Sequence, residues 1–163
     1  SGGGSGTNTC SDGSLPGGGT PSGPQAGSIV RLAAAHSGQC LDAVSSGTAN
    51  GTLLQQWGCN GTNAQAFRLQ TASAGGFNLV NVNSGTCVDV SNSSTADGAT
   101  IQLWECNGTA AQAFRLTANS NGYTLVNANS NKCAEVPGAS TAQGTKVTQY
   151  TCNGGTHQRW VLQ

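Results

Sequence analysis

The sequence predicts an all-β fold built from three copies of one unit that pack around a shared core. Three observations predict it. Cysteines recur at a fixed period, short apolar segments are separated by Gly, Asn and Ser clusters, and no segment longer than a turn has a helical period. The first 27 residues lack this pattern and form a separate region.

The cysteines define the repeat. The first cysteine of each copy recurs after 47 and then 46 residues, at Cys40, Cys87 and Cys133. A second cysteine follows each of them 19 residues later, at Cys59, Cys106 and Cys152. The copies therefore span approximately residues 28–72, 73–118 and 119–163, which together form one predicted domain over residues 28–163.

The eight aromatic residues all stand at repeat positions, as expected for a small, specified core. One group closes the copies: Phe67, Phe114 and Trp160. A second group stands two residues before the second cysteine: Trp57, Trp104 and Tyr150. The last two stand ten residues before a first cysteine: Phe77 and Tyr123. We predict that the two phenylalanines of the first group are core residues.

Each copy is predicted to contain four short strands, which gives about twelve strands in the domain. In the second copy they are the segments 77–82, 86–90, 100–106 and 113–118. One copy is too small to bury its own apolar face, so the three copies must pack together. A closed three-fold barrel with hairpins leaves no strand edge unpaired.

Seven cysteines in a chain of this length imply an oxidising compartment, so the protein is expected to be secreted. The constant spacing favours pairing within each copy: Cys40–Cys59, Cys87–Cys106 and Cys133–Cys152. Each bridge would close a loop of about 20 residues and stabilise the fold by roughly 3 kcal/mol. Zinc binding is the competing interpretation, but no Cys-x-x-Cys pair or paired histidine accompanies the cysteines.

Charge excludes several classes of partner. Only 7% of residues are charged, and six basic residues balance six acidic ones. No basic patch can form to bind nucleic acid or anionic membranes. No apolar run approaches the roughly 20 residues that span a bilayer. We therefore expect no nucleic-acid partner, no membrane insertion, no cofactor or metal, and a monomer.

Residues 1–27 are predicted to be a flexible linker, because ten Gly, three Pro and one large aliphatic residue cannot form a core. As a coil the segment would span roughly 30 Å. A linker at this end leads us to expect a further domain upstream in the same chain. Cys10 lies in the linker, and two alternatives stay open: it pairs with such a domain or another chain, or it is a free thiol.

Side-chain alternation brings polar groups together in the second copy. If Cys87 and Cys106 face each other on antiparallel strands, Asp89 lies opposite Trp104 and Gln102 lies beside them on the same face. Ile101 and Leu103 then point to the core. A carboxylate, an amide and an exposed indole suit a pyranose, which has one apolar face and a rim of hydroxyls.

Three alternatives remain open for these residues. The tryptophans Trp57 and Trp104 could belong to the core, and Asp42 and Asp89 could cap turns. The glutamines six residues after the second cysteine could be structural, bonding backbone inside the repeat: Gln65, Gln112 and Gln158.

The recurring Cys-x-acid, aromatic-x-Cys and Gln-x-aromatic motifs resemble the ricin B-type β-trefoil lectins, a family that includes the family 13 carbohydrate-binding modules of secreted microbial hydrolases. The resemblance covers residues 28–163. It implies a β-trefoil with one shallow sugar site per repeat. It also implies polysaccharide or oligosaccharide ligands of galactose, xylose, arabinose or glucose type.

The resemblance implies sugar-binding residues position by position. In the first copy these are Asp42, Gln55, Trp57 and Gln65, and in the second they are Asp89, Gln102, Trp104 and Gln112. The family's Asn before the last Gln is replaced by Ala64 and Ala111, and Asn63 stands one position earlier. The third copy departs further, with Glu135, Thr148, Tyr150, His157 and Gln158 at the site positions. Two or three sites are therefore expected, with copies one and two ranked above copy three, whose sugar-binding residues would be Glu135, Tyr150, His157 and Gln158.

Catalysis is not expected, because glycoside cleavage needs two carboxylates roughly 5 to 9.5 Å apart and the repeated acids occupy equivalent positions of a three-fold fold. The sequence predicts a non-catalytic module that tethers a secreted hydrolase to polysaccharide. A free-standing galactoside-binding lectin or toxin-targeting subunit is the alternative. A β-trefoil that binds proteins would leave the recurrence of Asp, Gln and Trp on one face unexplained.

Overall fold

The structure is a computed structural model that describes residues 23–120 and 122–163. The expectations for the linker up to residue 22 and for Cys10 therefore lie outside the described residues. Within the described part, no helix has the length and apolar character needed to cross a bilayer. Six three-residue 3₁₀ turns are its helical elements: η2 (Val44–Ser46), η3 (Asn63–Gln65), η4 (Ser91–Ser93), η5 (Ala110–Gln112), η6 (Pro137–Ala139) and η7 (Thr156–Gln158).

Thirteen strands follow the three repeats, four to a repeat, with the first strand of repeat one split in two at Arg31. Repeat one contains β2 (Ile29–Val30), β3 (Leu32–Ala34), β4 (Cys40–Ala43), β5 (Leu54–Trp57) and β6 (Phe67–Thr71). Repeat two contains β7 (Phe77–Asn81), β8 (Cys87–Val90), β9 (Ile101–Trp104) and β10 (Phe114–Asn119). Repeat three contains β11 (Gly122–Asn127), β12 (Cys133–Glu135), β13 (Thr148–Tyr150) and β14 (Trp160–Leu162).

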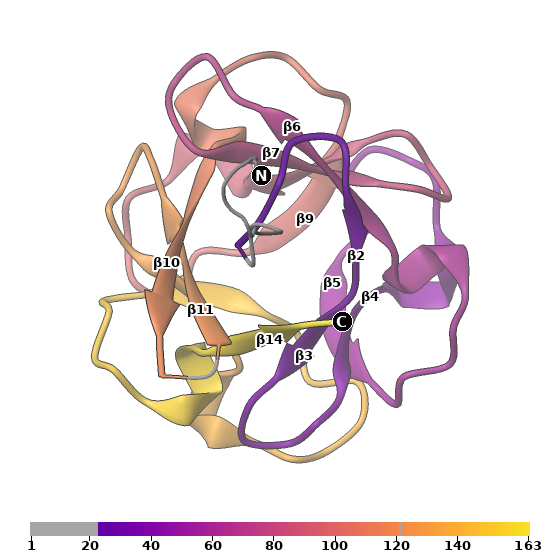
Figure 1. Cartoon of the computed structure of the whole chain (residues 1–163), viewed down its shortest axis with the longest axis vertical. Coiled ribbons are helices and arrows are strands. Elements are labelled where there is room, and N and C mark those ends of the chain that lie inside the picture. Colours follow the sequence, from indigo (N-terminus) through magenta and orange to yellow (C-terminus); the bar gives the residue numbers. More distant parts are fainter. Residues whose placement is uncertain (1–22, 121) are drawn as a thin grey trace, which may run out of the picture.

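The outer strands of the repeats form a ring of antiparallel pairs. The pairing runs β2, β6, β7, β10, β11, β14 and β3, and it returns to its start because only Arg31 separates β3 from β2. Three hairpins, β4–β5, β8–β9 and β12–β13, extend from this barrel. Viewed down the shortest axis of the molecule, the repeats surround a common centre (Figure 1). The predicted three-fold all-β fold is confirmed.

The core lies inside this ring. The aromatic residues that close the repeats, Phe67, Phe114 and Trp160, are almost fully buried, as predicted for the two phenylalanines. The other barrel aromatics lie opposite them, since Phe77 pairs with Phe114 and Tyr123 pairs with Trp160. Apolar residues of all three repeats form one buried cluster, so each repeat buries its apolar face against the other two, as the sequence predicts.

Three disulfides join the cysteines within each repeat: Cys40–Cys59, Cys87–Cys106 and Cys133–Cys152. The predicted pairing is confirmed, and the zinc interpretation of these six cysteines is wrong. Each bridge ties the start of a hairpin to the loop that follows it, because the second cysteine stands two residues after the last residue of its strand. The bridge therefore restrains the loop next to the hairpin end.

A loop of each repeat crosses to the hairpin of the next one. We call these segments the crossing loops and define them as residues 47–53, 94–100 and 140–146. In the first, the Gly51 N–H donates to the Leu103 carbonyl and the Leu103 N–H donates to the Thr52 carbonyl, both at 2.8 Å. The second pairs in the same way with Gln149 and the third with Gln56. The contacts run from repeat one to two, two to three and three to one.

Candidate functional site

The hairpin of repeat two carries the predicted polar face. Asp89 on β8 lies opposite Gln102 on β9, and the Gln102 Nε2 donates to the Asp89 Oδ2 at 3.0 Å. The predicted register, with Asp89 opposite Trp104, is wrong, because Trp104 lies opposite Cys87. Cys106 stands beyond the end of β9, so its bridge to Cys87 does not mark a register pair. The shift is two residues, so the faces predicted from alternation are unchanged.

The aromatic residues at the hairpin ends are exposed. Trp57, Trp104 and Tyr150 are 39%, 38% and 42% exposed, whereas Leu103, next to Trp104, is fully buried. The alternative that the tryptophans belong to the core is therefore wrong. The alternative that the aspartates cap turns also fails, because η2 and η4, which follow them, have no side-chain cap.

A shallow cavity of about 250 Å³ opens beside the hairpin of repeat two. Asp89, Gln102 and Trp104 line it together, so the structure brings the three predicted residues to one place. The opposite wall is η4 and the loop after Cys106: Ser91, Asn92, Ser93, Asn107 and Thr109. Clefts for drug-sized ligands usually measure about 300–1,000 Å³, so this cavity lies just below that range.

Two residues of η4 shape this wall through an uncommon backbone conformation. Asn92 and Ser93 have φ of 57° and 51°, in the left-handed region that residues with a Cβ rarely enter. The equivalent residues of repeat one, Ser45 and Ser46, have φ of 55° and 54°. Asn enters this conformation more readily than most residues with a Cβ, which fits Asn92, and in repeat three the equivalent pair is Gly138 and Ala139, with φ of 64° and 52°.

Repeat one repeats the arrangement. The Gln55 Nε2 donates to the Asp42 Oδ2 at 2.8 Å, and both residues line a cavity of about 360 Å³ together with Trp57. One feature is specific to this repeat. Lys146 of the third crossing loop donates to the Gln55 Oε1 at 3.4 Å, so the amide is held with its oxygen toward the cation and its nitrogen toward the carboxylate.

The Asn-Gly-Thr segments after the second cysteines complete both walls, and sequence reasoning missed them. Asn60 and Thr62 line the first cavity, as Asn107 and Thr109 line the second. Their recurrence at the same place in both copies is the signal that identifies them. Asn63, the predicted substitute for the family's Asn, is exposed in η3 and does not line the cavity, because the turn before it directs the chain away.

The glutamines at the repeat ends hold these turns in place. Gln65 is fully buried, accepts from the Asn60 N–H at 2.9 Å and donates to the Gly58 carbonyl at 3.0 Å. Gln112 makes the same two contacts with Asn107 and Glu105. The structural alternative for these two side chains agrees with these contacts, since neither lines its cavity.

In repeat three the carboxylate is occupied by protein donors. Gln158 Nε2 donates to the Glu135 Oε1 at 2.9 Å, and His157 Nε2 lies 3.3 Å from the same oxygen. Thr148 stands opposite Glu135 where the other repeats have glutamine. The longer Glu side chain thus reaches past the position of the aspartates and is bonded internally, although Tyr150 remains exposed nearby.

The electrostatics of repeat two centre on one carboxyl group. Burial of Asp89 raises its pKa above the ordinary value of 3.8, because removal from water disfavours the charged form. Hydrogen bonds from Gln102 and Gln112 oppose this effect without cancelling it. Asp89 is only 7% exposed, and it lines the cavity.

Comparisons with known proteins agree with this geometry. The family described as ricin-type beta-trefoil lectin domain matches residues 28–163. ThreeFoil, a designed three-fold symmetric protein, is 37% identical with a TM-score of 0.80, over 82% of this chain and 96% of its own. An exo-β-1,3-galactanase from Clostridium thermocellum is 30% identical with a TM-score of 0.79, over 85% of this chain and 30% of its own.

A more distant structure shares the fold alone. The ricin B-like lectin of Macrolepiota procera, solved in complex with lactose, is 18% identical with a TM-score of 0.73, over 86% of this chain and 97% of its own. Among curated proteins no relative matches this chain. The predicted β-trefoil is confirmed by the designed three-fold structure.

Proposed function

The chain belongs to the family of ricin-type beta-trefoil lectin domains, a non-catalytic carbohydrate-binding fold, and from this premise we propose that residues 28–163 bind polysaccharide through the cavities of repeats one and two. We further propose that this binding holds a secreted hydrolase, carried upstream in the same chain, on its substrate. We do not count repeat three as an equivalent site, because Gln158 and His157 both contact the Oε1 of its carboxylate and Thr148 stands where the other two repeats have glutamine.

The observation that carries the proposal is the meeting of Asp89, Gln102 and Trp104 in one cavity. The carboxylate accepts hydrogen bonds from two neighbouring hydroxyls of a sugar ring, and charge assistance makes these bonds the stronger kind. The amide donates to or accepts from a further hydroxyl. The exposed indole offers a flat apolar surface to the C–H face of the ring.

Among the galactose-, xylose-, arabinose- and glucose-type ligands, we rank galactose polymers first. The support is the 30% identity to a module of the exo-β-1,3-galactanase. This chain corresponds to only 30% of that protein, so a similar module there belongs to a longer chain with a hydrolase activity. The three disulfides support a location outside the cell.

Affinity electrophoresis of the full chain in gels that contain β-1,3-galactan, xylan, arabinan or β-glucan tests the binding. We expect retardation in at least one gel, and in the β-1,3-galactan gel first. Asp89→Ala should reduce the retardation severalfold, because it removes the charged acceptor and leaves the Gln102 amide without its partner. Retardation of the variant equal to that of the wild type would contradict the assignment of Asp89 to a sugar-binding site.

The matched control is Glu105→Gln, which neutralises an exposed carboxylate next to Trp104 that does not line the cavity. Its mobility with polysaccharide, relative to its own mobility in a gel without polysaccharide, should fall as much as that of the wild type. The tethering function is tested with the secreted native protein. Removal of residues 28–163 should slow hydrolysis of insoluble polysaccharide and leave hydrolysis of a short soluble substrate unchanged. A secreted product no larger than the 16.2 kDa of this chain would instead favour a free-standing lectin.

A further inference from the structure

We propose that the exposed aromatic residue of each repeat is positioned by the repeat before it in the ring, through one side chain of the crossing loop. The positioning residues stand at equivalent places, one before the glycine that recurs in each crossing loop. The pairs are Asn50 for Trp104, Asp97 for Tyr150 and Gln143 for Trp57. The structural part of this inference stands alone, and its effect on sugar affinity rests on the proposed function.

The contact is the same in all three repeats. The aromatic residue is the last residue of its strand, and the backbone N–H that follows it donates to the side-chain oxygen of the crossing loop. Glu105 N donates to the Asn50 Oδ1 at 2.8 Å. Gly58 N donates to the Gln143 Oε1 at 2.8 Å. Thr151 N donates to the Asp97 Oδ1 at 2.8 Å.

The crossing loops are fixed in register against the hairpins, so these acceptors cannot slide away. Next to Asn50, the backbone bonds between Gly51, Thr52 and Leu103 secure the loop on β9. Leu53 and Gln102 form an isolated β-bridge, and the equivalent bridges join Gln55 to Lys146 and Thr100 to Thr148. Each crossing loop thus acts as a short third strand beside the strand that carries the aromatic residue.

This contact matters because a strand end is the part of a hairpin that frays most easily. Trp104 is the last paired residue of β9, and the chain leaves the sheet at Glu105. A mobile indole must be ordered when a sugar binds, and the conformational entropy lost in that step lowers the affinity. The hydrogen bond from the Glu105 N–H to Asn50 therefore holds the Trp104 indole in place before the ligand binds.

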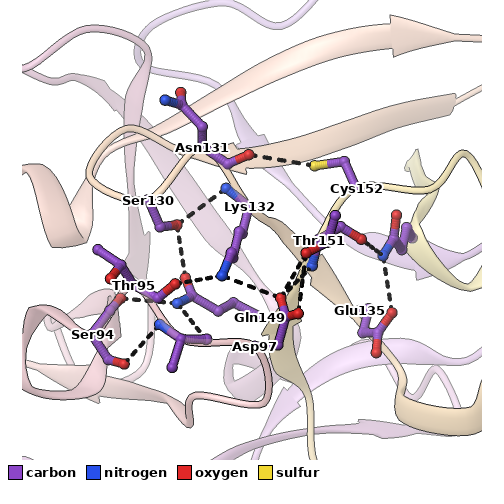
Figure 2. Close-up of polar contacts among 12 residues, drawn as sticks. Ser94, Thr95, Asp97, Ser130, Asn131, Lys132, Glu135, Gln149, Thr151 and Cys152 are labelled. Carbon is purple, nitrogen blue, oxygen red and sulfur yellow. Dashed lines mark hydrogen bonds and ion pairs between the residues drawn. The ribbon is translucent and has the colours of Figure 1, made fainter.

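Two of the three crossing loops also carry a charged group: Asp97 makes this contact itself, and Lys146 contacts the site amide instead. Figure 2 shows Asp97 between Lys132 and Thr151, and Lys132 Nζ lies 3.3 Å from the Asp97 Oδ1. The Thr151 hydroxyl donates to the same carboxylate oxygen at 2.8 Å. In the loop from repeat three, Lys146 reaches Gln55 as well. The repeat-one site is consequently supported at both its aromatic and its amide by repeat three.

The first test uses the ligand-free protein and two reciprocal variants, Asn50→Ala and Gln143→Ala, each the control for the other. Amide hydrogen exchange by NMR reports the two donors directly. Asn50→Ala should speed exchange at Glu105 severalfold and shift the Trp104 indole N–H signal, with Gly58 and Trp57 unchanged. Gln143→Ala should do the opposite. Equal changes at both hairpins, or no change at Glu105, would overturn the proposal.

The second test measures binding at repeat two alone, in a Trp57→Ala background, by titration with soluble β-1,3-galactan. Loss of one partly exposed hydrogen bond predicts an affinity about two- to fivefold weaker for Asn50→Ala. Asn50→Asp, which keeps the oxygen acceptor that Asp97 supplies in the next repeat, should restore the affinity. Gln143→Ala should leave it unchanged in this background.

The positioning of the aromatic residues and the binding of polysaccharide are tested by different measurements. If none of the four polysaccharides binds to any of these proteins, the proposed function fails, while the exchange rates at Glu105 and Gly58 still decide whether the crossing loops position the aromatic residues. If the polymer binds and Asn50→Ala binds as tightly as its parent, the positioning role is refuted and the proposed function stands.

Discussion

At the residue scale, the most informative side chain is Asp89. It combines two properties that oppose each other, since burial disfavours its charge whereas hydrogen bonding to sugar hydroxyls needs that charge. Gln102 compensates in part by donating to one carboxylate oxygen at 3.0 Å. The Asp89 carboxylate is therefore oriented as an acceptor. The part of the burial cost that Gln102 does not offset raises the pKa of Asp89 above 3.8.

This shift predicts an acid-sensitive site in repeat two. In an Asp42→Ala variant, affinity for β-1,3-galactan should fall as pH drops through the raised pKa of Asp89, at a pH above the ordinary 3.8. The same group does not destabilise the fold there, because an acid whose folded pKa is raised binds protons more readily in the native state.

Stability is expected to be lost at lower pH. The Thr151 hydroxyl and backbone N–H, with Lys132, hold the pKa of Asp97 below 3.8, so its contribution is present above 3.8 and is lost as pH falls through the lowered value. Parallel titration of binding and of near-ultraviolet circular dichroism separates the two events. Simultaneous loss of affinity and of folded signal would contradict the assignment to Asp89.

Residue spacing was enough to place Asp89, Gln102 and Trp104 on one face, because alternation along a strand depends on nothing outside the hairpin. It was not enough for their register, which the disulfide obscured. Asn107 and Thr109 line the same cavity from a loop, and the path of a loop depends on contacts such as Gln112 with the Asn107 N–H that spacing does not reveal.

At the scale of elements, the hairpins and the crossing loops form one unit across repeat boundaries. Gln149 on β13 is buried, and its Nε2 donates to the carbonyls of Ser94 and Ala96 at 2.9 Å each, while its Oε1 accepts from Ser130. Gln56 does the same for the third crossing loop. Repeat two has Leu103 at this position, so two of the three junctions contain a buried amide.

Replacing this amide should loosen a junction. Gln149→Leu keeps the volume but leaves two loop carbonyls without their donor, and we expect a loss of about 1–3 kcal/mol in the free energy of unfolding. Urea denaturation followed by fluorescence measures it. Gln70→Leu, at an exposed position of β6, is the control and should change stability by less than about 0.5 kcal/mol. An unchanged midpoint for Gln149→Leu would show that water replaces the lost donor.

The strands themselves were predictable, since the segments 77–82, 86–90 and 100–106 each contain an observed strand and the segment 113–118 covers all of β10 except Asn119. The crossing loops were not, because a Gly-containing turn carries no sign of which distant strand it will join. The partners of Gln56 and Gln149 likewise lie in another repeat, where sequence periodicity within one copy gives no information.

At the scale of the whole molecule, the three-fold arrangement sets the cavities of repeats one and two on one rigid body. Each cavity is shallow and should bind weakly, but a polymer offers both of them at once. Binding of a second sugar unit is then intramolecular and gains from effective concentration. Repetition of a weak site thus gives retention on polysaccharide without a deep pocket.

Substitutions at both sites distinguish avidity on a polymer from the affinity of a single site. On β-1,3-galactan, the double variant Asp42→Ala with Asp89→Ala should lose more binding than the product of the single losses. On a monosaccharide such as galactose, each single variant should remove one of two independent sites. Isothermal titration calorimetry with both ligands makes the comparison. Losses in the same proportion on polymer and monosaccharide would remove the argument for avidity.

The ring of pairings has one further consequence, for how the chain can be reconnected. The backbone groups of Gln163 bond to those of Arg31 at 2.9 and 3.0 Å, so the carboxyl end of the fold closes directly onto its first strand (Figure 1). Each repeat joins the next by antiparallel strand pairing, at this junction as at the other two, so no repeat has to come first. A circular permutant opened in the exposed turn at Ser73 and Ala74 should fold to the same barrel with repeat two leading.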